Sequence, residues 1–385
     1  MSKIVVVHII TRLELGGAQQ NTLYTVSHLD PEKFIPYLIA GEGGILDREA
    51  ALINHQVRFV PELQREVRPG RDLIALVKIY RLLREIRHRH GGSPMVVHTH
   101  SSKAGILGRL AARLAGIRQV VHTFHGFGFH DFQNPWIKSI YIFLEKWIGK
   151  ITTEFIFVSK DNQERARRLG IARSDSLLIR SGISFNSYRS VSREGSVMKS
   201  ELGIRETDRL ITMVACLKPQ KAPMDFVRMA GEVAKHFPEA RFILVGDGEL
   251  REEIVSEISR LNLNPVVQLT GWRRDIPAIL SATDIFVLSS LWEGLPRVLI
   301  EAKLSGLPVV TTDIEGSQEI LENGISGFIV PRKDYVALAE KVLYLLKNPS
   351  IAREMGKSGS PPPVDFDIDF MVKSQETVYT NMVLE

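Results

Sequence analysis

The stretch of sequence that indicates the fold is IVVVHII at residues 4–10, followed by ELGGAQ at residues 14–19. The first segment is an almost unbroken apolar run, rich in β-branched residues, which is typical of a strand buried on both faces of a parallel sheet. The paired glycines then lead into a helical pattern from residue 18 to about residue 29. A buried strand, a glycine loop and a helix in this order predict an α/β domain.

The alternation of strand-like and helical segments continues along the chain. Further strand-like runs lie at residues 34–40, 95–100, 120–124 and 155–158, with helical patterns at 73–90 and 103–114. After a turn-rich segment at 181–187, a second set of strand-like runs lies at 210–215, 241–245, 266–269, 284–288, 308–311 and 327–330. We therefore expect an α/β protein with two doubly wound domains, whose ligands bind at the carboxyl ends of the strands or in a cleft between the domains.

Length and composition agree with this expectation. The chain has 385 residues, which is too long for one ordinary core and suits two domains. The chain has 49 Lys and Arg and 44 Asp and Glu, so its net charge is +5. This charge fits an anionic partner without identifying it. Cys216 is the one cysteine, so a disulfide scaffold and a Cys-rich zinc site are excluded and a reducing compartment is expected.

Two glycine loops follow predicted strands. Gly16 and Gly17 come after the first strand, and Gly246 and Gly248 flank Asp247 at the end of a strand in the second domain. Glycines let the backbone approach a ligand closely, and a helix N-terminus attracts an anion. From these residues alone, a tight turn explains the first loop equally well and the second loop better.

The segment EGLPRVLIEA at residues 293–302 carries two carboxylates. Pro296 suits the first turn of a helix and Gly306 suits its end. Glu293 would lie in the preceding loop and Glu301 in the helix, where both could accept hydroxyl hydrogens of a polyol. On spacing alone, a surface helix with solvated glutamates explains the segment better.

Lysines and histidines provide further candidates. Lys218 and Lys221 follow a predicted strand and could neutralise a diphosphate, although a solvated charged loop explains them equally well. His98 and His100 share one face of a strand, as metal ligands can, but no carboxylate or cysteine lies beside them, so we expect no metal. His125 closes a strand before a glycine, where its ring could contact substrate hydroxyls.

In combination, these motifs resemble family 4 of the retaining glycosyltransferases, which have the GT-B fold. The resemblance covers about residues 3–382, and the Glu-x7-Glu element with its internal Gly-Leu-Pro is its most specific part. The matching segments are GGAQ at 16–19, HTFHG at 122–126, SGI at 181–183, VGDG at 245–248 and EGLP at 293–296 together with Glu301 and Ala302.

The resemblance implies two Rossmann-like doubly wound domains facing across a cleft. An acceptor-side domain would span residues 1–182 and a nucleotide-sugar-binding domain residues 183–365. Residues 366–385 would form a helix that crosses back to the first domain. The family's helix around residues 356–366 would here be interrupted by residues 361–363, which are all proline.

The resemblance also implies site residues. Glu301 would hold the donor ribose and Glu293 the hydroxyls of the transferred sugar, while Lys221 would neutralise the diphosphate. The candidate catalytic residues are His125, Lys221 and Glu293. The candidate donor-binding residues are Gly16, Gly17, Lys218, Gly246, Asp247, Gly294, Leu295, Val298 and Glu301.

A front-face retaining reaction, as described for this family, needs no protein nucleophile. We also expect the enzyme to be metal-independent, with no cofactor beyond the nucleotide sugar. The Asp-x-Asp pattern at residues 365–369 is similar to manganese motifs of glycosyltransferases with another fold, but its place in the tail favours helix capping. Cys216 stands where the family commonly has a diphosphate-binding arginine, and Lys218 is our candidate to compensate. Ser181 stands where asparagine is common.

We therefore predict a retaining hexosyltransferase that uses a UDP- or GDP-linked sugar and a glycan or lipid-linked acceptor in cell-surface polysaccharide biosynthesis. The alternatives are a GT-B nucleotide-sugar epimerase and a catalytically weak nucleotide-sugar-binding subunit of a partner transferase.

The acceptor side is marked by charge and aromatic residues. The segment from Lys78 to His90 predicts a strongly basic amphipathic helix, and residues 136–150 combine aromatic residues with lysines. Either could contact an anionic membrane, although ordinary core helices with solvated basic faces explain each segment taken singly slightly better. No nucleic-acid recognition motif is present. We expect a cytoplasmic protein and leave open peripheral attachment to the inner face of the plasma membrane.

Overall fold

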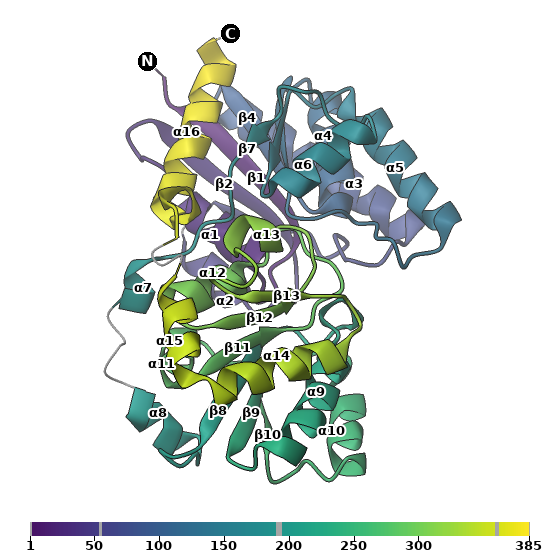
Figure 1. Ribbon diagram of the computed structural model, residues 1–385. Helices are drawn as coiled ribbons and strands as arrows, with labels where there is room; N and C mark the ends of the chain where they lie inside the picture. Colours follow the sequence, from purple (N-terminus) through teal and green to yellow (C-terminus); the bar gives the residue numbers. More distant parts are fainter. Residues whose placement is uncertain (1, 54–55, 190–194, 359–361, 385) are drawn as a thin grey trace. The chain divides into compact units, whose positions relative to one another are not determined.

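The computed structural model describes residues 2–53, 56–189, 195–358 and 362–384 (Figure 1). The chain divides into two units, one formed by Met1–Gly182 with Ile368–Glu385 and the other by Ile183–Asp367. The second unit extends two residues beyond the expected 365, because the backbone N–H of Ile183 donates to the carbonyl of Phe366 at 2.8 Å and Ile183 bridges to Asp367.

The first unit is built on a seven-stranded sheet with the order β3-β2-β1-β4-β5-β6-β7, in which every strand pair is parallel. The predicted strands are present, and the short β3 and β7, which form the two edges of the sheet, are additions. The strands are β1 (Ile4–Arg12), β2 (Phe34–Gly41), β3 (Val57–Phe59), β4 (Met95–His100), β5 (Gln119–Phe124), β6 (Glu154–Phe157) and β7 (Leu177–Leu178).

Helices cover both faces of this sheet, which explains the continuous apolar run of β1. Val5, Val7 and Ile9 of β1 pack in one core with α3 and α4, whereas Ile4 and Val6 pack in another with α16. The helices are α1 (Gly17–His28), α2 (Asp47–Leu52), α3 (Pro69–Arg89), α4 (Ser102–Leu114), α5 (Pro135–Gly149), α6 (Lys160–Arg168) and α16 (Ile368–Leu384).

The second unit repeats the same topology with a six-stranded parallel sheet in the order β10-β9-β8-β11-β12-β13. In each sheet the strand order reverses beside the first strand, at β1/β4 and at β8/β11, so the prediction of two doubly wound α/β domains is confirmed. The strands are β8 (Arg209–Val214), β9 (Ala240–Val245), β10 (Val267–Gly271), β11 (Ile285–Leu288), β12 (Val309–Thr312) and β13 (Phe328–Val330).

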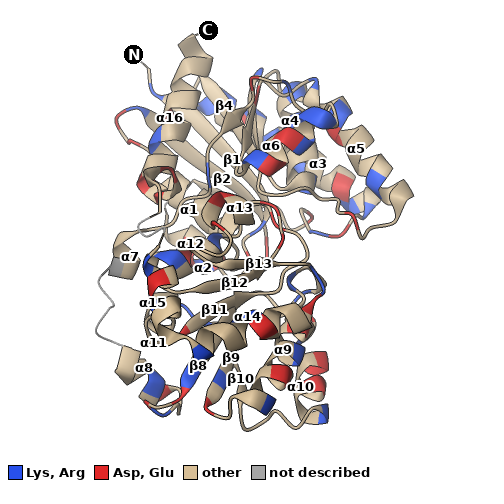
Figure 2. Cartoon of the chain, in the orientation of Figure 1, with Lys and Arg blue, Asp and Glu red and all other residues tan. Residues whose placement is uncertain are grey.

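The helices of the second unit carry interleaved charges of both signs, as α9 and α10 show in Figure 2. They are α7 (Asn186–Arg189), α8 (Gly195–Glu201), η1 (Pro219–Lys221), α9 (Pro223–His236), α10 (Arg251–Arg260), α11 (Ile276–Ala282), α12 (Arg297–Leu304), α13 (Ser317–Ile320), α14 (Tyr335–Lys347), α15 (Pro349–Lys357) and η2 (Val364–Phe366). Of the prolines expected to interrupt a helix near residues 356–366, Pro361 lies outside the described residues. Pro363 directly precedes η2.

Among the described residues, no helix combines the length and the apolar character that crossing a membrane requires.

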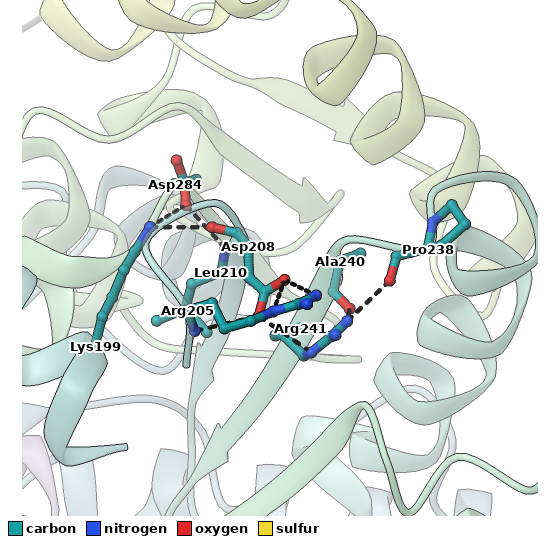
Figure 3. A network of polar contacts seen from close by, with 8 residues as sticks. All are labelled: Lys199, Arg205, Asp208, Leu210, Pro238, Ala240, Arg241 and Asp284. Atoms are coloured by element: carbon teal, nitrogen blue, oxygen red, sulfur yellow. Dashed lines mark hydrogen bonds and ion pairs between the residues drawn. The ribbon is translucent and has the colours of Figure 1, made fainter. Parts of the chain in front are cut away.

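A polar network joins the strands of the second sheet at the edge where they begin (Figure 3). Asp208 accepts hydrogen bonds from the Arg205 guanidinium at 2.8 Å and lies 3.5 Å from Nε of Arg241. Asp284 accepts from the backbone N–H of Leu210 at 2.8 Å and pairs with Lys199 at 3.4 Å. The Arg205 hydrogen bonds, together with the charge of Arg241, hold the pKa of the buried Asp208 carboxyl below its ordinary value. This network is structural, since substrate sites of such sheets lie at the opposite edge.

We predict that Asp208→Asn lowers the melting temperature by roughly 2–6 °C at neutral pH, because it removes a buried negative charge that Arg205 and Arg241 contact. A depressed carboxyl pKa contributes stability above the unfolded value and loses it as the pH falls through the folded value. The difference from wild type should therefore shrink below about pH 4. Asp175→Asn is the control, because the Asp175–Arg173 pair is 72% and 69% exposed. The prediction is contradicted if thermal denaturation shows no loss of melting temperature in Asp208→Asn, or a loss that does not change with pH.

Candidate functional site

Lys221 and Glu293 meet at the carboxyl edge of the second sheet, the side on which its parallel strands end. Because β8 and β11 are neighbours, the loops that follow them start side by side. Lys221 ends η1 in the first loop and forms an ion pair with Oε1 of Glu293 in the second. The hydroxyl of Ser290 donates to the same carboxylate oxygen at 2.8 Å. The Glu293 side chain is only 8% exposed and that of Lys221 22%, so the pair is fixed rather than freely solvated.

Further hydrogen bonds hold the two loops together around this pair. The backbone N–H of Leu291 donates to the carbonyl of Gln220 at 2.7 Å, and the Gln220 side chain donates to the carbonyl of Trp292 at 2.9 Å. The Ser289 hydroxyl donates to the carbonyl of Lys221 at 3.0 Å. Glu315, from the loop after β12, accepts from the backbone N–H of Glu293 at 3.3 Å. The sequence patterns gave no signal for Ser290, Gln220 or Glu315, which reach the site only through the strand order.

Gly246 and Asp247 lie at the carboxyl end of β9, next to the β8 loop. Gly246 has φ +135, and a Cβ there would lie 2.0 Å from the carbonyl oxygen of Ala215. The carbonyl of Asp247 accepts from the backbone N–H of Leu217 at 3.0 Å, and its carboxylate pairs with Arg251 at 3.4 Å. Glycine is therefore needed for strand-end packing, and this loop supports the segment that carries Lys218 and Lys221.

Glu301 lies in α12, which begins directly after Pro296, and it hydrogen-bonds to Tyr188 of α7. Burial raises the pKa of the Glu301 carboxyl, while the nearby Arg297 guanidinium and the Tyr188 hydrogen bond oppose this rise. Tyr188 was not anticipated, because it lies more than 100 residues earlier in the sequence. Of the other candidates in this segment, Gly294 and Leu295 are buried and Val298 is half-buried. The carboxylate of Glu301 is thus held in place where it could accept ligand hydroxyls.

The first-unit candidates lie at the carboxyl edge of the first sheet. Gly16 is the N-cap of α1 after β1, and Gly17 is the first helical residue. His125 follows β5 and is half-buried, with its Nε2 atom 3.1 Å from Nδ1 of His100. Because β1 and β5 run parallel in one sheet, the glycine loop and His125 lie at the same edge.

Two possible metal motifs can now be located. The ring nitrogens of His8, His98 and His100 lie within 4.8 Å of one another, and in the part of the chain that the structure describes no second group of three potential ligands is this close. The Asp365–Asp369 segment forms η2 and the start of α16. Asp369 accepts a hydrogen bond from the Tyr24 hydroxyl at 2.6 Å, which helps to attach α16 to α1.

Comparison with known proteins gives matches to both halves of the chain. The profile of the family described as Glycosyltransferase Family 4 matches residues 15–186, and that described as Glycosyl transferases group 1 matches residues 196–360. An Escherichia coli protein named UDP-Gal:alpha-D-GlcNAc-diphosphoundecaprenol alpha-1,3-galactosyltransferase is 35% identical over 339 residues, covering 86% of this chain and 85% of that protein.

More distant relatives extend this picture. A Campylobacter jejuni protein named N,N'-diacetylbacillosaminyl-diphospho-undecaprenol alpha-1,3-N-acetylgalactosaminyltransferase is 27% identical over 296 residues, covering 74% of this chain and 77% of that protein. The structure of Anabaena HepE in complex with UDP and glucose has a TM-score of 0.82 at 18% identity, over 98% of this chain and 99% of that one. The two parallel sheets and these matches together show that the chain belongs to glycosyltransferase family 4 and has the GT-B fold.

Proposed function

We propose that this glycosyltransferase moves a hexose-type sugar from a UDP-linked donor to a lipid-linked acceptor in cell-surface polysaccharide biosynthesis, with retention of configuration and without a metal ion. The observation that carries the proposal is the fixed Lys221–Glu293 pair at the carboxyl edge of β8 and β11, with Glu301 in the following helix. The names of the two diphosphoundecaprenol-dependent relatives support the acceptor, and the UDP complex of HepE supports UDP over GDP.

The side chains at this edge can perform distinct parts of the reaction. As the bond between the sugar and the diphosphate breaks, negative charge grows on the leaving phosphate, and the Lys221 ammonium would stabilise it. Glu293 would accept hydroxyl hydrogens of the transferred sugar and Glu301 those of the ribose. Lys218 would supply the second positive charge where Cys216 replaces the arginine that is usual in the family. His125, at the carboxyl edge of the first sheet, is a further candidate for contact with the transferred sugar.

Retention follows from the same proposal. The donor of the Escherichia coli relative is UDP-Gal, whose sugar is α-linked, and its name gives an α-1,3 product. An unchanged α configuration is the outcome of a retaining transfer. If this chain performs the same type of reaction, its product is α-linked too.

The acceptor side of the proposal concerns α5, whose outward face is unusually apolar. Trp136, Ile140, Phe143 and Trp147 are 81%, 57%, 67% and 53% exposed, and their spacing places them on one side of the helix. Lysines at positions 138, 146 and 150 accompany them. Aromatic side chains together with lysines suit the interface of an anionic membrane.

A buried ion pair fixes the orientation of this face. Arg109 of α4 and Glu145 of α5 are 0% and 2% exposed, and Nη2 lies 2.6 Å from Oε2. Burial lowers the pKa of Arg109, and Glu145 opposes the shift. Because Glu145 must point inward to meet Arg109, the aromatic side of α5 points outward. We therefore propose that α5 contacts the membrane that carries the lipid-linked acceptor.

The basic segment from Lys78 to His90 is a weaker candidate for the membrane contact, because several of its charges already have partners. Lys78 pairs with Glu62 at 2.6 Å and Arg89 with Glu85 at 2.9 Å. Arg87 donates to the carbonyl of Ala115 at 2.7 Å. These contacts are those of an ordinary helix that packs on its own domain.

A product assay tests the reaction. With UDP-galactose, a diphosphoprenol-linked acceptor and EDTA, we expect an α-linked product identified by NMR. Lys221→Ala should lower kcat by about 10²–10³-fold, as the loss of a leaving-group contact does in other enzymes. The exposed Lys235→Ala in α9 is the control and should leave the rate unchanged.

Several outcomes would contradict this account. A β-linked product would exclude retention. Activity that needs Mn²⁺ would exclude metal independence and make Asp365–Asp369 the candidate metal ligands. Formation of an epimerised nucleotide sugar would identify the epimerase alternative. UDP binding with neither transfer nor donor hydrolysis would identify a binding subunit.

Co-sedimentation with vesicles of phosphatidylglycerol and phosphatidylethanolamine tests the membrane contact. Trp136→Ser with Trp147→Ser should reduce binding at least tenfold, since burial of an aromatic side chain contributes about 2 kcal/mol. Trp272→Ser in the second unit, where Trp272 is 39% exposed, is the control. Undiminished binding of the α5 double variant would refute the role of α5. If vesicle binding is lost instead when Arg81, Arg84, Arg87 and Arg89 are neutralised, α3 rather than α5 contacts the membrane.

A further inference from the structure

A row of buried histidines lies on the face of the first sheet that α16 covers. His8 of β1 is directly opposite His98 of β4, and His100 follows on the same face. His8 and His98 are 0% exposed and His100 2%, and the rings of His98 and His100 lie 4.2 Å apart. Three buried imidazoles side by side are unusual in a core, because each ring brings two polar nitrogens that need partners.

Hydrogen bonds connect this row to His125 at one end and to α16 at the other. Nε2 of His125 lies 3.1 Å from Nδ1 of His100, and Nε2 of His100 lies 3.0 Å from Nδ1 of His8. Nε2 of His8 lies 3.5 Å from the hydroxyl of Tyr379, the longest of these contacts. The candidate sugar-contacting residue is thus linked through two buried rings to the C-terminal helix.

Tyr379 also joins a second branch. Its hydroxyl lies 2.6 Å from Nδ1 of His98, whose Nε2 lies 2.6 Å from Oγ1 of Thr123. The same hydroxyl donates to Oε1 of Gln375 at 3.3 Å. If the Thr123 hydroxyl donates to Nε2 of His98, then Nδ1 of His98 donates to the Tyr379 oxygen, and the single Tyr379 proton goes either to Gln375 or to His8.

The imidazoles of the row are neutral at physiological pH. Burial lowers the pKa of His8 to about 3 and those of His98 and His100 well below the ordinary value. Burial also raises the pKa of Tyr379, so its hydroxyl keeps its proton. A neutral imidazole has one donor nitrogen and one acceptor nitrogen, so fixing the direction of one bond fixes every following bond.

With His98 in this form, the bonds along the row can take two directions. If Tyr379 donates to His8, then His8 and His100 each donate from Nδ1, and His125 accepts at Nε2 and carries its proton on Nδ1. If Tyr379 donates to Gln375, every bond reverses and His125 carries its proton on Nε2. The other nitrogen of His125 is accordingly a donor in the first case and an acceptor in the second.

We infer that Tyr379 and Gln375 of α16 are positioning residues that set the ring tautomer of His125 through His8 and His100. Only the kinetic consequence rests on the proposed function: the tautomer decides whether His125 donates to or accepts from a sugar hydroxyl. A metal held by His8, His98 and His100 is the competing explanation. A bound metal ion would have to displace these hydrogen bonds, because the ring nitrogens that would bind it already contact protein groups.

Long-range ¹H–¹⁵N NMR of ¹⁵N-histidine-labelled protein tests the inference, with His125 assigned through His125→Asn. Gln375→Leu removes the competing acceptor, so we expect His125 to carry its proton on Nδ1. In Tyr379→Phe the row loses the group that sets its direction, and His125 should show a mixture of tautomers. In a transfer assay this variant should lower kcat by about tenfold with little change in the donor KM, the size expected for one misdirected hydrogen bond.

Met382→Leu is the matched control, because Met382 packs on the same sheet from α16 and is 6% exposed. It should leave both the tautomer and kcat as in wild type. Unchanged His125 signals in folded Gln375→Leu and Tyr379→Phe would overturn the inference, and so would a stoichiometric metal ion found by elemental analysis. The NMR readout needs no activity, so its failure is distinguishable from failure of the proposed function.

Discussion

The parallel pairing of β8 with β11 is the constraint from which the candidate donor site follows. Ile211 and Thr212 of β8 lie beside Ile285 and Phe286 of β11, so both strands end at one edge of the sheet. Their loops therefore emerge side by side, and residues 72 positions apart can form one ion pair. Charges at the opposite edge, around Asp208, hold the strand beginnings together and lie away from the candidate donor site.

The same constraint organises the first unit. Parallel β1, β4 and β5 place His8, His98 and the segment before His125 on neighbouring strands, and α16 closes over them. The helix that follows the last segment of the second unit thus contributes Tyr379 to the interior of the first. In this account the C-terminal helix both completes a core and determines the chemistry of a ring at the edge of the sheet.

Sequence patterns predicted most of the fold because its strands are long apolar runs with turn residues between them. They missed β3 and β7, the short strands at the two edges of the first sheet. Lys221, Glu293 and Glu301 could be selected as candidates through the family resemblance, because their spacing alone did not favour a binding site over solvated side chains. Ser290, Glu315, Tyr188 and Tyr379 could not, since isolated polar residues carry no periodicity and gain their partners only through tertiary packing. His98 and His100 were recognised as a pair, but His8 joins them only through the register of β1 with β4.

Hydrogen exchange of the protein with and without saturating UDP shows whether the β8 and β11 loops bind the nucleotide. The account predicts slower exchange in residues 215–222 and 289–301, where the β8 and β11 loops and α12 would hold the nucleotide. Exchange in residues 205–209 and 238–241, at the opposite edge, should not change. Protection at that opposite edge with none in the β8 and β11 loops would contradict the account, as would the absence of binding by UDP, GDP and ADP alike.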